Sequence, residues 1–167
     1  FLLHHMPVKT VLFLVGGLIE NEQNSGSLDK SGGLAARTPL VAALFAIPAL
    51  SLAGIPPFSG FVAKLAVVSA GVEQSSSAVV AAALVAGFLT VLSMNKIWMG
   101  VFWGERPDDV EPIPTAVGNR WLMRGSTALA VAATLAIAAS AGALLDLSER
   151  AASDLMDPAV YIAEVLS

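Results

Sequence analysis

Long apolar runs separated by short polar segments dominate the chain. Because the hydrocarbon core of a bilayer is about 30 Å thick, a spanning helix needs about 20 mostly apolar residues. The segment 20–37 is rich in Gly, Ser and Asn, which indicates a loop. The apolar pattern therefore predicts an all-α fold, a polytopic bundle of transmembrane helices. Its expected membrane segments are 1–19, 38–55, 57–72, 78–103 and 121–145.

The second apolar region, 38–72, is interrupted at its middle by the run GIPPFSG. As one uninterrupted helix, these residues would reach about 50 Å, which is too long for a single span. Pro56 and Pro57 remove backbone donors, and a flanking glycine such as Gly60 weakens helical structure further. We therefore expect one discontinuous helix, with its break at Pro56, Pro57 and Gly60.

Composition supports the membrane assignment. The chain is 56% hydrophobic and 13% charged, whereas soluble domains carry roughly 25% charged residues. This composition excludes a soluble enzyme, and a net charge of −4 gives no basic surface for nucleic acid. The absence of cysteine excludes a disulfide framework and thiolate metal sites. No run suggests a metal site, a phosphate loop or a nucleophile–base pair, so no cofactor is expected.

The two ends of the chain differ from its middle. In 146–167, apolar residues recur at helical spacing among charges, which predicts an amphipathic tail on the membrane surface or on a partner subunit. Within it, Asp157 followed by Pro158 is typical of a helix start. At the other end, Phe1 already lies in an apolar run. We expect residues 1–145 to be a transmembrane domain and the chain to be a fragment of a larger one.

Ionisable residues inside membrane segments are candidate functional residues, because placing each one there is costly. His5 and Lys9 are four residues apart and share a helix face. Two neighbouring cations repel each other, which suits a pair that exchanges protons near neutral pH. The alternative is that both side chains reach out to the interface. His4 projects about 100° away from His5, and we expect it to be peripheral or packed.

Lys64 follows the break and has apolar neighbours on both sides, so its side chain has no easy route to the interface. A broken helix beside a buried ionisable residue is a recurring arrangement in transporters. The alternative is a structural ion pair. Lys96 lies roughly 10 Å of helix before Trp103, and it either reaches the interface or joins an ion path.

Several of these runs resemble the family of proton-translocating antiporter-like subunits. This family comprises the Mrp-type multisubunit Na+/H+ antiporters and the large membrane subunits of respiratory complex I. Its tenth membrane helix is similar to HHMPVKTVLFLVGGLIE, and its His-xxx-Lys-xx-Leu-Phe pattern is matched by His5, Lys9, Leu12 and Phe13. Its eleventh helix and discontinuous twelfth helix resemble ALSLAGIPPFSGFVAKLAVVSAG, in which Lys64 falls on the key ionisable position. The end of its thirteenth helix resembles SMNKIWMGVFWG.

Within the family, the D-type branch of the Mrp antiporter subunits is the most similar, as judged by IPPFSGFVAK, KIWMGVFWG and the ending DLSERAASDLMDPAVYIAEVLS. One departure is Pro7, which removes a backbone hydrogen bond and is expected to bend the start of the first helix. The resemblance implies a larger protein built from two inverted repeats, of which this chain holds the last membrane helices.

The resemblance implies a function. The chain is expected to belong to a membrane subunit of a monovalent cation (Na+)/proton antiporter, a secondary transporter and not an enzyme, in the cell membrane of a prokaryote. Its partners would be the other subunits of a hetero-oligomeric antiporter complex, the lipid bilayer, Na+ and H+. Protons would move stepwise along a buried line, with Lys9 and Lys64 as stations, His5 as relay and Lys96 as a further candidate.

Two alternatives to the antiporter stay open. The first is a proton-pumping membrane subunit of respiratory complex I (NADH:quinone oxidoreductase) or of a membrane hydrogenase, with the same fold but driven by redox chemistry. The second is a structural membrane anchor whose lysines are merely paired.

Overall fold

The structure is a computed structural model that describes residues 1–23, 26–105, 119–156, 162 and 165. This part of the chain contains helices and no strand, which confirms the expected all-α fold. A 3-10 turn spans Leu28–Lys30, and a π-helix, η2, spans Trp98–Trp103. The α-helices are α1 (Leu2–Gln23), α2 (Leu34–Arg37), α3 (Pro39–Ala53), α4 (Ser59–Glu73), α5 (Ser77–Ile97), α6 (Arg120–Ala139) and α7 (Ala141–Met156).

Three stretches of helix within the described residues are long and apolar enough to cross a membrane. They are α1, α5 continued by η2, and α6, with 22, 27 and 20 residues respectively. Helices α3 and α4 have 15 residues each, or about 22 Å of helix, which is shorter than a bilayer core. These two helices are therefore the halves of an interrupted unit.

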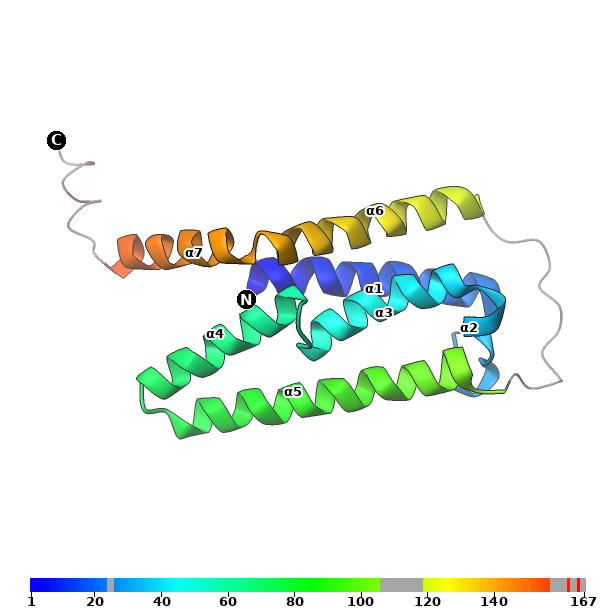
Figure 1. The fold of residues 1–167 in the computed structure, drawn as a ribbon, viewed down its shortest axis with the longest axis horizontal. Helices are drawn as coiled ribbons and strands as arrows, with labels where there is room; N and C mark the ends of the chain where they lie inside the picture. Colours follow the sequence, from blue (N-terminus) through cyan, green and yellow to red (C-terminus); the bar gives the residue numbers. More distant parts are fainter. Residues whose placement is uncertain (24–25, 106–118, 157–161, 163–164, 166–167) are drawn as a thin grey trace.

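Helix α1 lies at the centre of the bundle, where it contacts α3, α4 and α6. Helices α4 and α5 form a hairpin, and α5 also packs against α3 (Figure 1). The rings of Phe45, Trp98 and Phe102 stack where α3 meets η2. Helix α5 has no fully buried residue although it is strongly apolar, which fits a lipid or protein environment around it. The main apolar core comprises Val11, Val15, Leu18, Leu34, Val41, Leu44, Phe45, Val101, Phe102 and Val131.

The break in the discontinuous helix lies between α3 and α4. Gly54 ends α3 in the left-handed region, with φ of 83°, and its N–H bonds to the carbonyl oxygens of Leu50 and Ser51. A glycine is the usual residue at such a C-terminal position. Pro56 and Pro57 follow, and they cannot supply the N–H groups that would continue the helix. The predicted break is confirmed, although Gly60 lies in the first turn of α4 and not in the break itself.

The boundary between the last two described helices, α6 and α7, lies before residue 145, where it was expected. The segment 121–145, predicted as one helix, contains the end of α6 at Ala139 and the start of α7 at Ala141. Between them lies Ser140, whose hydroxyl donates to the carbonyl of Ala136. Helix α7 then follows α6 along the same side of the molecule (Figure 1). The predicted helix start at Asp157–Pro158 lies outside the described residues.

Candidate functional site

Lys64 lies in α4 beside the end of α3. Its Nζ donates a hydrogen bond to the carbonyl oxygen of Ala53 at 2.8 Å. Ala53 is the last residue of α3, and carbonyl groups at a helix C-terminus lack helical partners and carry partial negative charge. The stem of Lys64 also packs on Gly54, where an added Cβ would lie 2.7 Å from Lys64 Cδ. At the helix break, Lys64 thus has a hydrogen-bond acceptor for its ammonium group and space for its side chain beside a glycine.

A cavity of about 400 Å³ lies beside Lys64. His4 and His5 of α1 line it together with Lys64, and the other walls come from small and apolar residues of α3, α4 and α5. Helix α5 approaches closely, because a Cβ added at Gly87 would lie 3.6 Å from Lys64 Nζ. The fold therefore brings His5 and Lys64, which are far apart in the sequence, to the same cavity.

His5 offers an unpaired nitrogen in this region. Its ring stacks on Phe1, with ring centroids 5.1 Å apart. Its Nδ1 is buried and has no hydrogen-bond partner among the described residues. A buried polar atom without a partner costs about 1–3 kcal/mol.

Lys9 and Lys96 lie apart from this cavity. Lys9 is exposed on α1, one turn after His5, and does not line the cavity. Lys96 is exposed in the last turn of α5, directly before η2. Neither lysine forms a hydrogen bond or ion pair with another residue in the described part of the chain. Their roles in ion movement stay predictions.

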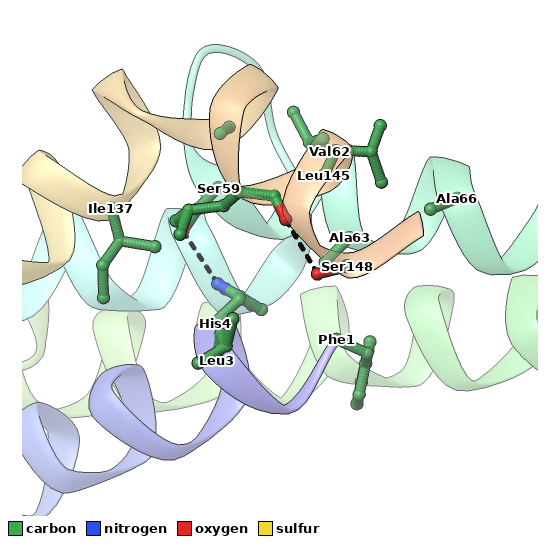
Figure 2. Close-up of a pocket in the computed structure, with 12 residues that line it drawn as sticks. Phe1, Leu3, His4, Ser59, Val62, Ala63, Ala66, Ile137, Leu145 and Ser148 are labelled. Atoms are coloured by element: carbon green, nitrogen blue, oxygen red, sulfur yellow. Dashed lines mark hydrogen bonds between the residues drawn. The ribbon is translucent and has the colours of Figure 1, made fainter. Parts of the chain in front are cut away.

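His4 is packed and not peripheral. Its Nδ1 lies 2.8 Å from the hydroxyl oxygen of Ser59, and this oxygen lies 3.3 Å from that of Ser51. Figure 2 shows the His4 ring directed at Ser59, the first residue of α4. The shared face of His5 and Lys9 favoured those two residues as candidates on α1. The sequence did hold a signal that could have marked His4. It is a second ionisable residue in an apolar helix, and two serines that could pair with it flank the helix break.

A second polar cluster, which the sequence did not predict, lies at the opposite end of α1. Arg124 of α6 forms an ion pair with Glu22, with Nη2 and Oε1 2.6 Å apart. The buried amide of Gln23 accepts from the backbone N–H of Gly32 at 3.0 Å and donates to the carbonyl of Val101 at 3.5 Å. These contacts fasten α6, the 20–37 segment and η2 to the end of α1. Within the described residues, no group of His, Asp or Glu is arranged to hold a metal ion.

A family model described as "NADH:quinone oxidoreductase/Mrp antiporter, TM" matches residues 1–90, which is more than half of the 167-residue chain. The chain belongs to this family. The matched part contains α1, the broken α3–α4 unit with Lys64, and most of α5. The family resemblance drawn from the sequence is thereby confirmed, and with it a multi-pass membrane protein.

Individual relatives agree with the family match. The D subunit of the Na(+)/H(+) antiporter of Alkalihalophilus pseudofirmus is 37% identical over 166 residues, covering 99% of this chain and 33% of the relative. An N subunit of the NADH-quinone oxidoreductase of Streptomyces griseus is 32% identical over 152 residues, covering 90% of this chain and 27% of the relative.

A solved structure is also similar. A chain of the Mrp complex from Dietzia sp. DQ12-45-1b superposes with a TM-score of 0.82 and 35% identity, covering 99% of this chain and 38% of that one. The chain thus spans about a third of the length of the proteins it matches.

Proposed function

We propose that the chain is part of an ion-translocating membrane subunit of a monovalent cation (Na+)/proton antiporter, of the Mrp D type. Its proposed place is the cell membrane of a prokaryote, in a complex with other antiporter subunits. The name of the similar D subunit from Alkalihalophilus pseudofirmus supports this assignment, as does the likeness to a chain of an Mrp complex. The main structural support for this proposal is the position of Lys64, which bonds to the broken helix at Ala53 and lines a cavity together with His5.

The proposed mechanism moves one proton at a time between neighbouring basic groups. The Ala53 carbonyl holds the Lys64 ammonium at the break, while His5 presents a ring nitrogen without a partner among the described residues. Charges interact strongly in a low-dielectric interior, so a proton that arrives at His5 favours release of the Lys64 proton. Lys9, one helical turn from His5, would be the next station. Na+ movement on another part of the complex would be coupled to these steps.

The deciding experiment replaces Lys64 in the complete antiporter complex. We expect Lys64→Ala to lower sodium-dependent proton flux by about 100-fold or more, the scale of losing a proton-transfer group, while assembly persists. Lys64→Arg keeps the positive charge but does not release its proton, so it should fail as well. Flux is measured in vesicles, and assembly is measured by co-purification of the other subunits.

Ser93→Ala is a matched control for this experiment, because the Ser93 hydroxyl bonds to its own helix at Leu89. The control should keep full flux. Normal flux in assembled Lys64→Ala complex would exclude the proposed role and favour a structural membrane anchor.

The second candidate is a proton-pumping subunit of a complex I-type enzyme. The similarity to N subunits of NADH-quinone oxidoreductases favours it. The proton path would be the same, but redox chemistry in other subunits would drive it. Purification of the native complex separates the two: iron–sulfur subunits with NADH oxidation indicate the redox enzyme, whereas sodium-driven proton flux without a reductant indicates the antiporter.

A further inference from the structure

Three polar side chains from three different helices meet beside the helix break. They are His4 of α1, Ser51 of α3 and Ser59 of α4, and they are 5%, 2% and 4% exposed. The His4 Nδ1 lies 2.8 Å from the Ser59 Oγ, which lies 3.3 Å from the Ser51 Oγ. Polar groups at membrane depth are costly unless paired, and they commonly mark ion or proton pathways. This cluster is distinct from the bond between Lys64 and Ala53.

His4 stands between two cavities. On one side it lines the cavity of about 400 Å³ with His5 and Lys64. On the other side it lines, together with Ser59, a cavity of about 100 Å³ whose opposite wall comes from α6 and α7 (Figure 2). Since a water molecule occupies about 30 Å³ of liquid, the smaller cavity has room for a few. The His4 ring and the Ser59 hydroxyl are therefore a polar connection between the two spaces.

The charges around His4 are unequal on its two sides. The larger cavity holds Lys64, and the His5 ring centroid lies 6.5 Å from that of His4. Helix α3 has no titratable residue in its sequence. Apart from His4 itself, the side chains that line the smaller cavity are uncharged, and those from α6 and α7 are Ile137, Ala141, Leu144, Leu145 and Ser148. Repulsion from the basic groups thus directs a proton on His4 towards Ser59 and the smaller cavity.

We propose that His4 and Ser59 form a branch of the proton path, which joins the Lys64 cavity to the cavity beneath α6 and α7. The branch rests on the proposed function, because its protons come from the larger cavity. In one step, neutral His4 accepts a proton on Nε2 from that cavity and gives its Nδ1 proton to the Ser59 oxygen.

The rest of the step completes the proton balance. Ser59 passes its own hydroxyl proton to a water molecule in the smaller cavity. One proton crosses, and both side chains end neutral. Transfer of the remaining proton from Nε2 back to Nδ1, by way of water, then returns His4 to its starting tautomer.

The test uses the complete antiporter complex in vesicles, with sodium-dependent proton flux followed across a range of pH. In His4→Gln, the amide keeps a hydrogen bond to Ser59 but does not take up or release a proton. We expect flux to fall by about ten-fold or more, and the dependence of flux on pH to differ from that of the unaltered complex. Ser59→Ala should show the same loss, and Ser59→Thr, which keeps the hydroxyl, should restore most of the flux.

The double variant His4→Gln/Ser59→Ala should be no worse than either single one, because groups that act as a unit are not additive. Ser93→Ala, in which a hydroxyl bonded to its own helix is lost, should keep full flux. Assembly is checked by co-purification. If His4→Gln does not assemble, the smaller change Ser59→Ala and its rescue by threonine still decide the matter.

Several results would overturn the branch. Full flux in His4→Gln is one. An even loss at all pH values, or losses that multiply in the double variant, would mean that His4 only holds α4 in place. These outcomes can be distinguished from failure of the proposed function. Normal flux in Lys64→Ala would exclude both the proposed function and the branch. An inactive Lys64→Ala beside a normal His4→Gln would exclude the branch alone.

Discussion

Gly60 decides, at the scale of one residue, how closely α4 approaches α3. A Cβ added at this position would collide with the backbone carbonyl of Ser51 and would lie 3.0 Å from the Cε1 atom of His4. A backbone carbonyl within a helix cannot rotate away, so relief requires the two halves of the broken unit to separate. The glycine in the first turn of α4 is therefore required by close approach and not by its dihedral angles.

From this contact we expect Gly60→Ala to destabilise the complex by about 1–3 kcal/mol, the usual cost of overpacking. The change also displaces Ser59 and so lowers ion flux. The measurement is the thermal midpoint of purified complex, followed by flux in vesicles. Gly125→Ala is the control, because a Cβ there meets no atom of this chain within 4 Å. A Gly60→Ala midpoint equal to that of the control would show that the two helices are not in contact in the complex.

The sequence singles out Lys64 as a candidate, whereas it leaves open whether His4 is peripheral or packed, and the reason is physical. Lys64 stands alone among apolar residues after a proline break, so its local sequence is enough to mark it. Whether His4 faces lipid or a neighbour depends on which helix packs against α1, and its partner Ser59 is 55 residues away in the sequence. Helix α1 is apolar on nearly every side, so periodicity does not reveal its buried face.

At the scale of elements, α6 is joined to α1 by the ion pair between Arg124 and Glu22. The two side chains are 24% and 12% exposed, and Arg124 Nε is buried without a partner among the described residues. Loss of one member of a partly buried pair leaves the other charge poorly solvated. The pair therefore matters more for docking α6 than an exposed surface pair would.

Arg124→Ala should loosen α6 at this end of the bundle. We expect a loss of about 1–3 kcal/mol, the range for hydrogen bonds that involve charged groups, with faster proteolysis near the start of α6. Arg120→Ala, which removes an exposed arginine from the same helix, should change little. The readouts are the thermal midpoint and limited proteolysis of the complex, and identical behaviour of the two variants would contradict an anchoring role for the pair.

Helix boundaries could be predicted from the sequence where a residue chemically prevents the helix from continuing. The prolines after Gly54 cannot donate backbone hydrogen bonds, so the break could be located from sequence alone. The division at Ser140 was not predicted, because the surrounding ATLAIAASAGALL is mostly alanine and leucine, and a single glycine such as Gly142 is tolerated in a helix. The bond of the Ser140 hydroxyl to the preceding turn gives no signal either, because Ser93 makes the same bond inside the continuous α5.

At the scale of the whole molecule, the chain forms an open bundle with apolar surfaces on α1 and α5. Phe13, Phe88 and Leu84 are among the exposed large hydrophobic residues. Such surfaces fit a bilayer or further protein, and the chain spans about a third of the length of its relatives. Lys9 lies on an exposed part of α1 beyond the cavity of Lys64. A path through Lys9 would therefore use groups outside the described bundle.

This placement leads to a prediction for Lys9 and Lys96. Lys9 lies four residues, or about 6 Å of helix, from His5, so its charge acts directly on the proposed relay. Lys96 stands near the end of α5, roughly 10 Å of helix before Trp103, where its side chain can reach the interface. We expect Lys9→Ala to lower sodium-dependent proton flux by about ten-fold or more, and Lys96→Ala to lower it much less.

Initial flux rates in vesicles with matched amounts of assembled complex provide the measurement for these two variants. Lys9→Arg separates two roles for Lys9, because arginine keeps the charge and does not release its proton. Failure of Lys9→Arg indicates a proton station, whereas normal flux indicates that only the fixed charge beside His5 matters. Equal losses in Lys9→Ala and Lys96→Ala would place Lys96 on the path, at a depth where its ammonium no longer reaches the interface.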